Sequence, residues 1–270
     1  MFRACRLILL IVALGVPNLA AASGLIRLTD RDDLYGWEAI GRVDIDSGGY
    51  CTGTLIATNL VLTAAHCLFD GKNKPIPASE IQFRAGLHDG HTIAERRVTR
   101  YAIADGYSPT SGTPIEKIRS DAALLELESA IQSAKAAPFA VHDRPIKGEK
   151  ISVVSYGQGR DKALSWQKRC SILNRWQGII EFDCNVTFGS SGAPIFTEGD
   201  YRARIVSLVV SGTKDRQGNT IAYGMYLPPV IDGLKRKLRA MPRGYSTGSA
   251  RTEKSTDTSI RSSGAKFAKP

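Results

Sequence analysis

Short apolar runs separated by turn-forming residues are the feature of this sequence that most limits its fold. The runs are rich in Val, Ile, Leu and Tyr, and Gly, Asn, Asp and Pro stand between them, which is typical of β-strands joined by turns. The sequence contains no internal repeat and no regular alternation with helical segments, which argues against a parallel α/β sheet. We therefore predict an all-β chain, with its clearest strands at Thr54–Ile56, Leu60–Thr63, Ala122–Leu127, Ile151–Tyr156, Arg204–Val210 and Ile221–Leu227.

The chain is large enough to bury a real core. It has 270 residues, of which 43% are hydrophobic, so disorder of the whole chain is excluded. At this length, one large β domain or two ordinary domains are both possible. Near the C-terminus, Val230, Ile231, Leu234 and Leu238 follow helical spacing. They predict a helix over 230–240, within a terminal segment of residues 229–240.

The two ends of the chain differ in composition from the rest. Residues 1–22 combine a positively charged start, an apolar run over 7–16 and small residues at 20–22, which is the pattern of an export signal. The apolar run is too short to span a bilayer core of about 30 Å as a helix, although an uncleaved anchor is the alternative. Residues 241–270 are rich in Ser, Thr, Gly, Lys and Arg and predict a flexible basic tail.

Because of the export signal, we expect the protein to lie in the periplasm or outside the cell. The chain carries a formal net charge of +10, and a basic tail could contact an anionic surface through electrostatics alone. A solvated tail that aids solubility is the simpler interpretation. We expect a monomer that has no specific nucleic-acid partner.

Four cysteines remain beyond the export signal: Cys51, Cys67, Cys170 and Cys184. An even number in an exported chain usually means disulfides, and four cysteines allow three connectivities. We expect neighbours to pair, Cys51 with Cys67 and Cys170 with Cys184, since each pair closes a short local loop that a hairpin could hold. A zinc site is the competing interpretation, but no close C-x-x-C pair is present.

Three short segments contain the residues that could do chemistry. His66 follows an apolar run and small residues and stands beside a cysteine, so it would be held as a general base must be. Asp121 stands at the head of an apolar run, where burial would be costly without a partner. In Gly189-Ser190-Ser191-Gly192, two glycines bracket two serines, which predicts a tight turn with converging N–H groups and a projecting hydroxyl.

Taken together, the three segments resemble those of the chymotrypsin-fold (trypsin-like) serine proteases, and more narrowly the exported bacterial branch that includes the glutamyl endopeptidases. Leu62-Thr-Ala-Ala-His66-Cys67 is similar to the histidine motif, Asp121-Ala-Ala-Leu-Leu to the aspartate motif, and Gly189 to Pro194 to Gly-Asp-Ser-Gly-Gly-Pro with two changes. The resemblance covers roughly residues 36–238. An α/β-hydrolase is disfavoured, because there the serine comes first in the chain and the elbow is Gly-x-Ser-x-Gly.

The resemblance implies a fold and a function. The fold is two antiparallel six-stranded β-barrels with a C-terminal helix: a protease domain over 23–240, with barrels at about 36–140 and 141–228. The function is that of a secreted serine endopeptidase acting on proteins or peptides without a cofactor. Ser191 would be the nucleophile, His66 the base and Asp121 its orienting partner. The N–H groups of Gly189 and Ser191 would form the oxyanion hole, and the bridge between Cys51 and Cys67 is also a family feature.

The resemblance also implies residues around the substrate. Asn185 would lie at the base of the primary pocket, beside Val186 and Thr187, and Val209 and Gly224 would form its far wall. Ser207 resembles the family serine that supports the aspartate. Asn185 supplies no counter-ion for a Lys or Arg side chain, so we expect a small or medium apolar substrate side chain instead.

Two further expectations depend on what the sequence lacks. Digestive members of the family carry an Asp before the nucleophile, which pairs with a newly freed N-terminal amine, whereas Ser190 has no charge to offer. We expect activation not to need that ion pair. His88 and His91 are close in sequence but have no third ligand nearby, so we expect a surface loop and no metal site. The alternative function is a non-catalytic binding protein on a protease scaffold that uses its basic surface and tail.

Overall fold

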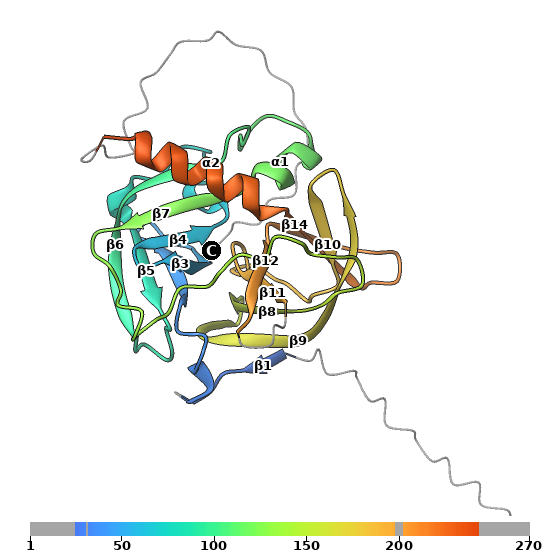
Figure 1. The fold of residues 1–270 in the computed structure, drawn as a ribbon, viewed down its shortest axis with the longest axis horizontal. Coiled ribbons are helices and arrows are strands. Elements are labelled where there is room, and N and C mark those ends of the chain that lie inside the picture. The colour runs from blue at the N-terminus through green and yellow to red at the C-terminus, as the bar shows by residue number, and fades with distance from the viewer. Residues whose placement is uncertain (1–24, 31, 198–201, 243–270) are drawn as a thin grey trace, which may run out of the picture.

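The computed structural model describes residues 25–30, 32–197 and 202–242, so the predicted export signal and nearly all of the basic tail lie outside the described residues. The chain forms two β-sheets side by side, with helix α2 lying across one end of them (Figure 1). The expected all-β, chymotrypsin-like fold class is confirmed.

The first sheet is a closed antiparallel barrel. Its strands follow the order β2-β3-β4-β7-β6-β5 around the barrel. Alternation along β5 shows how the sequence forms the wall, because Ile81, Phe83 and Ala85 are buried while Gln82 and Arg84 are partly exposed. The strands are β2 (Ile40–Ile45), β3 (Tyr50–Ala57), β4 (Leu60–Thr63), β5 (Ile81–Ala85), β6 (Ala94–Ile103) and β7 (Ala123–Leu127).

The second sheet is curled but does not close into the second six-stranded barrel that the resemblance implied. Its strands follow the order β12-β11-β8-β9-β10-β14-β13, and β1 adds an eighth strand beside β9. Where no backbone ladder joins β12 to β14, the buried Ser207 hydroxyl donates to the Met225 carbonyl oxygen at 3.0 Å. The strands are β1 (Leu25–Arg27), β8 (Lys150–Gly157), β9 (Arg160–Trp176), β10 (Ile179–Phe182), β11 (Pro194–Thr197), β12 (Arg204–Leu208), β13 (Ser211–Lys214) and β14 (Thr220–Met225).

The terminal helix is confirmed, although it begins earlier than predicted. Helix α2 spans Leu227–Ala240, so Pro228 and Pro229 lie in its first turn instead of before it. Prolines are tolerated there because first-turn N–H groups have no acceptor within the helix. No helix in the described part of the chain is both long enough and apolar enough to cross a membrane.

A second helix, α1 (Pro114–Ser120), was not predicted. Its signal is a capping box in the sequence: the Thr113 hydroxyl accepts from the Glu116 backbone N–H, and the Glu116 carboxylate accepts from the Thr113 N–H. The helix is short, which is why its apolar spacing is not conspicuous.

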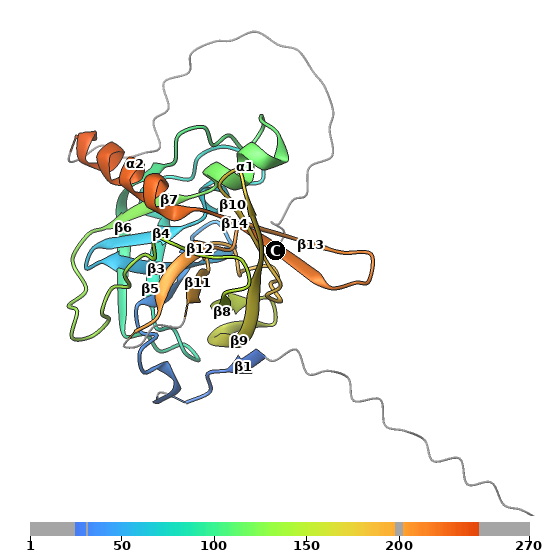
Figure 2. The ribbon, with the colours of Figure 1, turned by 45° about the vertical axis from the view of Figure 1, so that its right-hand side comes forward.

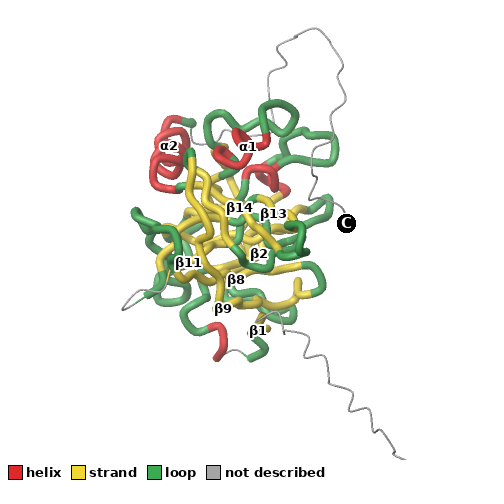
Figure 3. Tube along the Cα trace, turned by 90° about the vertical axis from the view of Figure 1, so that its right-hand side faces the viewer, coloured by secondary structure: helices red, strands yellow, loops and turns green. Residues whose placement is uncertain are grey.

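Both helices connect the two sheets. Helix α2 follows the last strand of the second sheet yet packs on β6 and β7 of the first, and α1 leaves the first barrel to contact β10 and β14. The two helices lie at the same end of the molecule (Figures 2 and 3). Between the sheets, the Trp37 ring lies 5.1 Å from that of Trp166 and 5.2 Å from that of Phe196. The two helices and these aromatic contacts therefore join the two sheets.

Candidate active site

His66 lies where the chain leaves the first barrel after β4. It is the second residue of a 3₁₀ turn over Ala65–Leu68. The next residue, Cys67, is bonded to Cys51 on β3, with a Cα–Cα distance of 6.3 Å. This disulfide ties the turn to the barrel wall, and its sulfur atoms, although close to His66, are not available as zinc-binding thiolates. A second bridge joins Cys170 to Cys184, so both predicted pairings are present.

Asp121 is placed by helix α1, at the residue that caps its C-terminus. One carboxylate oxygen, Oδ1, accepts from the His66 backbone N–H at 2.8 Å, and the other, Oδ2, lies 2.6 Å from His66 Nδ1. The carboxylate is an acceptor, so Nδ1 carries the proton and Nε2 is left as the basic nitrogen. The structure brings these two predicted residues together, across 55 positions of sequence.

Charge and burial act in opposite directions on the histidine. Burial alone lowers the pKa of His66, but the charge of Asp121 and its hydrogen bond to the ring outweigh burial and raise the pKa above 6.5. Nε2 is buried and has no hydrogen-bond partner among the described residues. Tyr107 lies nearby, and burial together with the Asp121 charge raises the pKa of its phenol. His66, paired with Asp121, is therefore a base whose Nε2 nitrogen is shielded from solvent and free of hydrogen bonds within the described residues.

The serine loop packs against the strands that lead to His66. Gly189 and Gly192 have positive φ angles of 82° and 76°, as the glycine-bracketed turn predicts. A Cβ on Gly192 would lie 2.3 Å from Thr63 Oγ1 and 2.4 Å from the Thr52 carbonyl oxygen, so this position admits no side chain. The Thr52 N–H donates to the Ser191 carbonyl oxygen at 2.9 Å. Strand β3 thus holds the serine loop against the first barrel.

Ser190, next to the candidate nucleophile, is fully buried. Its hydroxyl lies 3.1 Å from the buried hydroxyl of Ser155 on β8, and it accepts weakly from the Thr187 N–H at 3.4 Å. Two neutral hydroxyls thus occupy the position where digestive relatives were expected to hold an ion pair. Ser155 was not identified from the sequence, because nothing local to it marks a partner 35 residues away.

Two backbone donors of this loop are unused. Neither the Gly189 N–H nor the Ser191 N–H meets an acceptor among the described residues, whereas the Ser190, Gly192 and Ala193 N–H groups all do. Free N–H groups that bracket a nucleophilic serine can stabilise negative charge that develops on a carbonyl oxygen.

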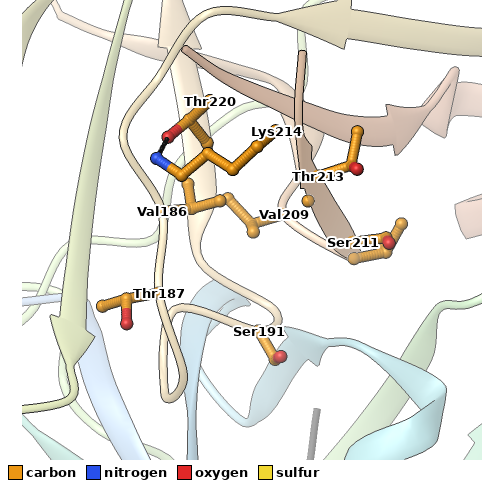
Figure 4. A pocket seen from close by; sticks show the side chains of 10 residues that line it. Val186, Thr187, Ser191, Val209, Ser211, Thr213, Lys214 and Thr220 are labelled. Atoms are coloured by element: carbon orange, nitrogen blue, oxygen red, sulfur yellow. Dashed lines mark hydrogen bonds between the residues drawn. The ribbon is translucent and has the colours of Figure 1, made fainter. Parts of the chain in front are cut away.

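A pocket opens beside Ser191, with a volume of about 180 Å³. Ser191 lies at one end, Lys214 and Thr220 at the other, and Val186 and Val209 between them (Figure 4). The complete lining is Val186, Thr187, Ser191, Val209, Val210, Ser211, Gly212, Thr213, Lys214 and Thr220. Of the predicted pocket residues, Val209 lines the wall, and Asn185 touches the lining because its Oδ1 accepts from the Thr220 hydroxyl at 3.3 Å.

Two predicted site residues lie behind this wall instead of on it. Ser207 is fully buried and its hydroxyl donates to the Met225 carbonyl oxygen, so it does not support Asp121 as the resemblance implied. A Cβ on Gly224 would lie 2.1 Å from the Leu208 carbonyl oxygen, so this glycine permits β14 to approach β12 and does not face the pocket. Both residues had been assigned by resemblance to the family, and the short local patterns that carried the resemblance do not report which face of a strand a side chain occupies.

Comparison with known proteins identifies relatives of this chain. The family model described as "Trypsin-like peptidase domain" matches residues 51–202, more than half of the chain. Granzyme M of Rattus norvegicus is 26% identical over 147 residues, 48% of this chain and 54% of that protein. Serine protease SP24D of Anopheles gambiae is 30% identical over 149 residues, 54% of this chain and 51% of that protein. The chain therefore spans about half the length of these curated relatives.

Solved structures share the fold. The structure of a Glu endopeptidase in complex with MPD superimposes with a TM-score of 0.66 at 17% identity, over 82% of this chain and 99% of that one. The protease Anisep from Arthrobacter nicotinovorans gives a TM-score of 0.58 at 17% identity, over 76% of this chain and 96% of that one. At these identities the likeness is one of fold.

Proposed function

The chain belongs to the family of trypsin-like peptidase domains, and on that premise we propose that it is an exported serine endopeptidase that cleaves peptide bonds through Ser191, His66 and Asp121. Ser191 Oγ attacks the carbonyl carbon, and His66 Nε2 takes the hydroxyl proton and later delivers it to the leaving amine. Asp121 keeps the ring oriented and stabilises the imidazolium. The negative oxygen that develops is held by the Gly189 and Ser191 N–H groups.

The observation that carries this proposal is the 2.6 Å contact between Asp121 Oδ2 and His66 Nδ1, with Nε2 left free. A histidine that merely satisfied a core hydrogen bond would not need its second nitrogen buried and without a partner among the described residues. Loss of the histidine or of the serine would be expected in a non-catalytic binding protein on this scaffold, whereas His66 and Ser191 are both present.

The proposed activation differs from that of the digestive relatives. Because Ser190 contacts Ser155 and not a charged group, the nucleophile loop does not depend on a freed N-terminal amine. Variants with different N-termini beyond the export signal should therefore have equal activity. Activity confined to one processed N-terminus, and lost when its amine is blocked, would contradict this mechanism. The two disulfides support export to an oxidising compartment, the periplasm or the cell exterior.

Labelling with a fluorophosphonate tests the proposed function directly. The activated serine oxygen displaces fluoride from phosphorus, so the purified protein should be labelled, and Ser191→Ala and His66→Ala should not be. Ser111→Ala, which removes an exposed hydroxyl, is the matched control and should label as the parent does. Folded protein that is not labelled would favour the binding-protein alternative.

A further inference from the structure

A partly buried cation without a partner lies next to the serine loop. Arg160 begins β9, and its side chain folds back over Gly157, where a Cβ atom would lie 2.2 Å from Arg160 Nη2. The Nη1 atom is buried and has no hydrogen-bond partner among the described residues, and none of the ion pairs between those residues includes Arg160. Burial lowers the pKa of the guanidinium, but an arginine side chain stays charged at neutral pH.

The carboxylates of this region are paired with other arginines. Asp161, the next residue in the chain, lies 3.9 Å from Arg42 Nη1, and Asp44 pairs with Arg42 and with Arg84. A buried donor that has no acceptor costs free energy, and the cost is larger when the donor is charged. A ligand that brings its own acceptor would remove this cost. Because no hydrogen bond within the described residues holds Nη1 of Arg160, the guanidinium can turn toward such a ligand without breaking one there.

The turn between β8 and β9 fixes Arg160 beside the serine loop. The Gln158 N–H donates to the Phe188 carbonyl oxygen at 2.7 Å, directly before the first glycine of that loop. A Cβ atom on Gly157 would lie 2.9 Å from Thr187 Cγ2 as well as close to the guanidinium, so Arg160 and Thr187 are neighbours. Thr187 lines the pocket beside the candidate nucleophile, whereas Arg160 does not. The cation therefore lies next to the site but outside that pocket.

The position of His66 indicates where the released part of a substrate would lie. In the proposed mechanism this ring protonates the leaving amine, so the released segment begins beside it. Both sulfur atoms of the Cys51 disulfide lie within 4.8 Å of a His66 ring nitrogen. Tyr50 precedes Cys51, and its ring packs against Gly189, where a Cβ atom would lie 2.3 Å from Tyr50 Cε2. Burial raises the pKa of Tyr50, and the charge of nearby Arg160 opposes this rise. A chain that leaves His66 past the disulfide therefore crosses Tyr50 and reaches Arg160.

We propose that Arg160 is a specificity-determining residue that selects substrates with a carboxylate side chain, Glu or Asp, at the first or second position after the cleaved bond. The guanidinium turns to donate to the carboxylate in a charge-assisted hydrogen bond, which arginine can form in a bidentate geometry. An extended chain advances about 3.3 Å per residue, so it crosses the Tyr50 ring within about two residues. Lysine or arginine at those positions is disfavoured by like charge. Nothing local in the sequence marks Arg160, because its neighbours Tyr50 and Thr187 come from other segments.

This inference rests on the proposed peptidase function, and one experiment separates the two. Quenched fluorescent peptides share one sequence up to the cleaved bond and carry Glu, Gln, Leu or Lys at the first or at the second position after it. Their kcat/KM values are compared alongside fluorophosphonate labelling. The parent enzyme should prefer Glu to Gln by about 10-fold at one of these positions, the low end of the range for a hydrogen bond to a charged group. The preference should shrink as the salt concentration rises, because the Arg160 side chain is only partly buried.

Variants of Arg160 distinguish recognition from packing. Arg160→Met removes the charge and should still be labelled, while the Glu and Gln peptides should be cleaved at similar rates. Arg160→Lys keeps a charge and should retain part of the preference for Glu. Arg160→Glu should exchange that preference for one for Lys, which a general loss of folding cannot produce. Arg169→Met is the matched control, since it removes an equal charge from an exposed position on the same strand and should preserve the preference for Glu.

The outcomes separate the inference from the proposed function. A labelled, active enzyme that does not prefer Glu at either position overturns the inference alone. So does a preference that survives Arg160→Met, or an Arg160→Met variant that loses the same factor of kcat/KM on every peptide, which would mean that Arg160 only packs against Gly157. Absence of both labelling and cleavage overturns the proposed function, and the inference with it.

Discussion

Removal of the Asp121 charge is the perturbation that most sharply separates chemistry from folding. Asp121→Asn keeps an oxygen to accept from the His66 N–H, now at 2.8 Å, but replaces Oδ2 with an NH₂ group 2.6 Å from Nδ1. An NH₂ group donates, so Nδ1 must become the acceptor and the proton moves to Nε2. His66 then cannot accept the Ser191 proton. We expect kcat to fall by about 10⁴-fold, the loss typical of this change in a triad and equal to about 5.5 kcal/mol of barrier.

The stability of this variant should change far less than its activity. The lost charge-assisted hydrogen bond contributes about 1.5–3 kcal/mol, offset in part because a neutral amide is less costly to bury than a carboxylate. Urea unfolding at neutral pH and steady-state kinetics on one peptide substrate measure the two effects side by side. Asp70→Asn, the same change in an exposed loop, is the control. Asp121→Asn with more than a tenth of parental kcat would refute the assigned tautomer and role.

Three further predictions concern pH, backbone space and crosslinking. Because Asp121 raises the pKa of His66 above 6.5, kcat/KM should decline as the pH falls through a value above 6.5, where the ring gains a proton and stops acting as a base; an acid limb well below 6.5 would contradict this. Gly192→Ala should lower the free energy of unfolding in urea by several kcal/mol more than Gly218→Ala. Both glycines have positive φ, but only a Cβ on Gly192 would collide with backbone atoms. Equal losses of stability would mean that the strained backbone conformation alone accounts for the effect. Replacing Cys51 and Cys67 together by Ala should lower the free energy of unfolding by about 3 kcal/mol, measured under oxidising conditions, and no change under those conditions would show that the bridge does not constrain the unfolded chain.

Much of the fold follows from patterns that lie within a few residues of each other. β4 occupies Leu60–Thr63, the predicted range, because its apolar and β-branched run begins directly after the turn residue Asn59. Two errors of helix placement have local causes as well. The first turn of α2 accepts both prolines, and α1 is a capped helix of about two turns whose capping box was present in the sequence but was not used for the prediction.

The candidate site likewise divides into residues that a local sequence motif identifies and residues that no local motif identifies. His66, Asp121 and the serine turn were identified because each stands in its own contiguous motif, and the short loops between neighbouring cysteines suggested both disulfides. Ser207 was misplaced because its role was carried over from a short local resemblance, whereas its hydroxyl donates to the Met225 carbonyl oxygen. A shift of register along a strand moves a side chain from one face to another, and no local pattern reports such a shift.

The sequence by itself identified six of the fourteen strands in the described residues, the terminal helix, the pairing of cysteines and the three residues proposed to carry the chemistry, because each is encoded by neighbouring residues. Only the tertiary structure decided which residues meet across the sheets. Ser155 meets Ser190, and Lys214 and Thr220 meet Asn185, at the end of the pocket. These contacts depend on how β8, β13 and β14 pack around the serine loop, and packing is a property of the whole chain that no single segment carries.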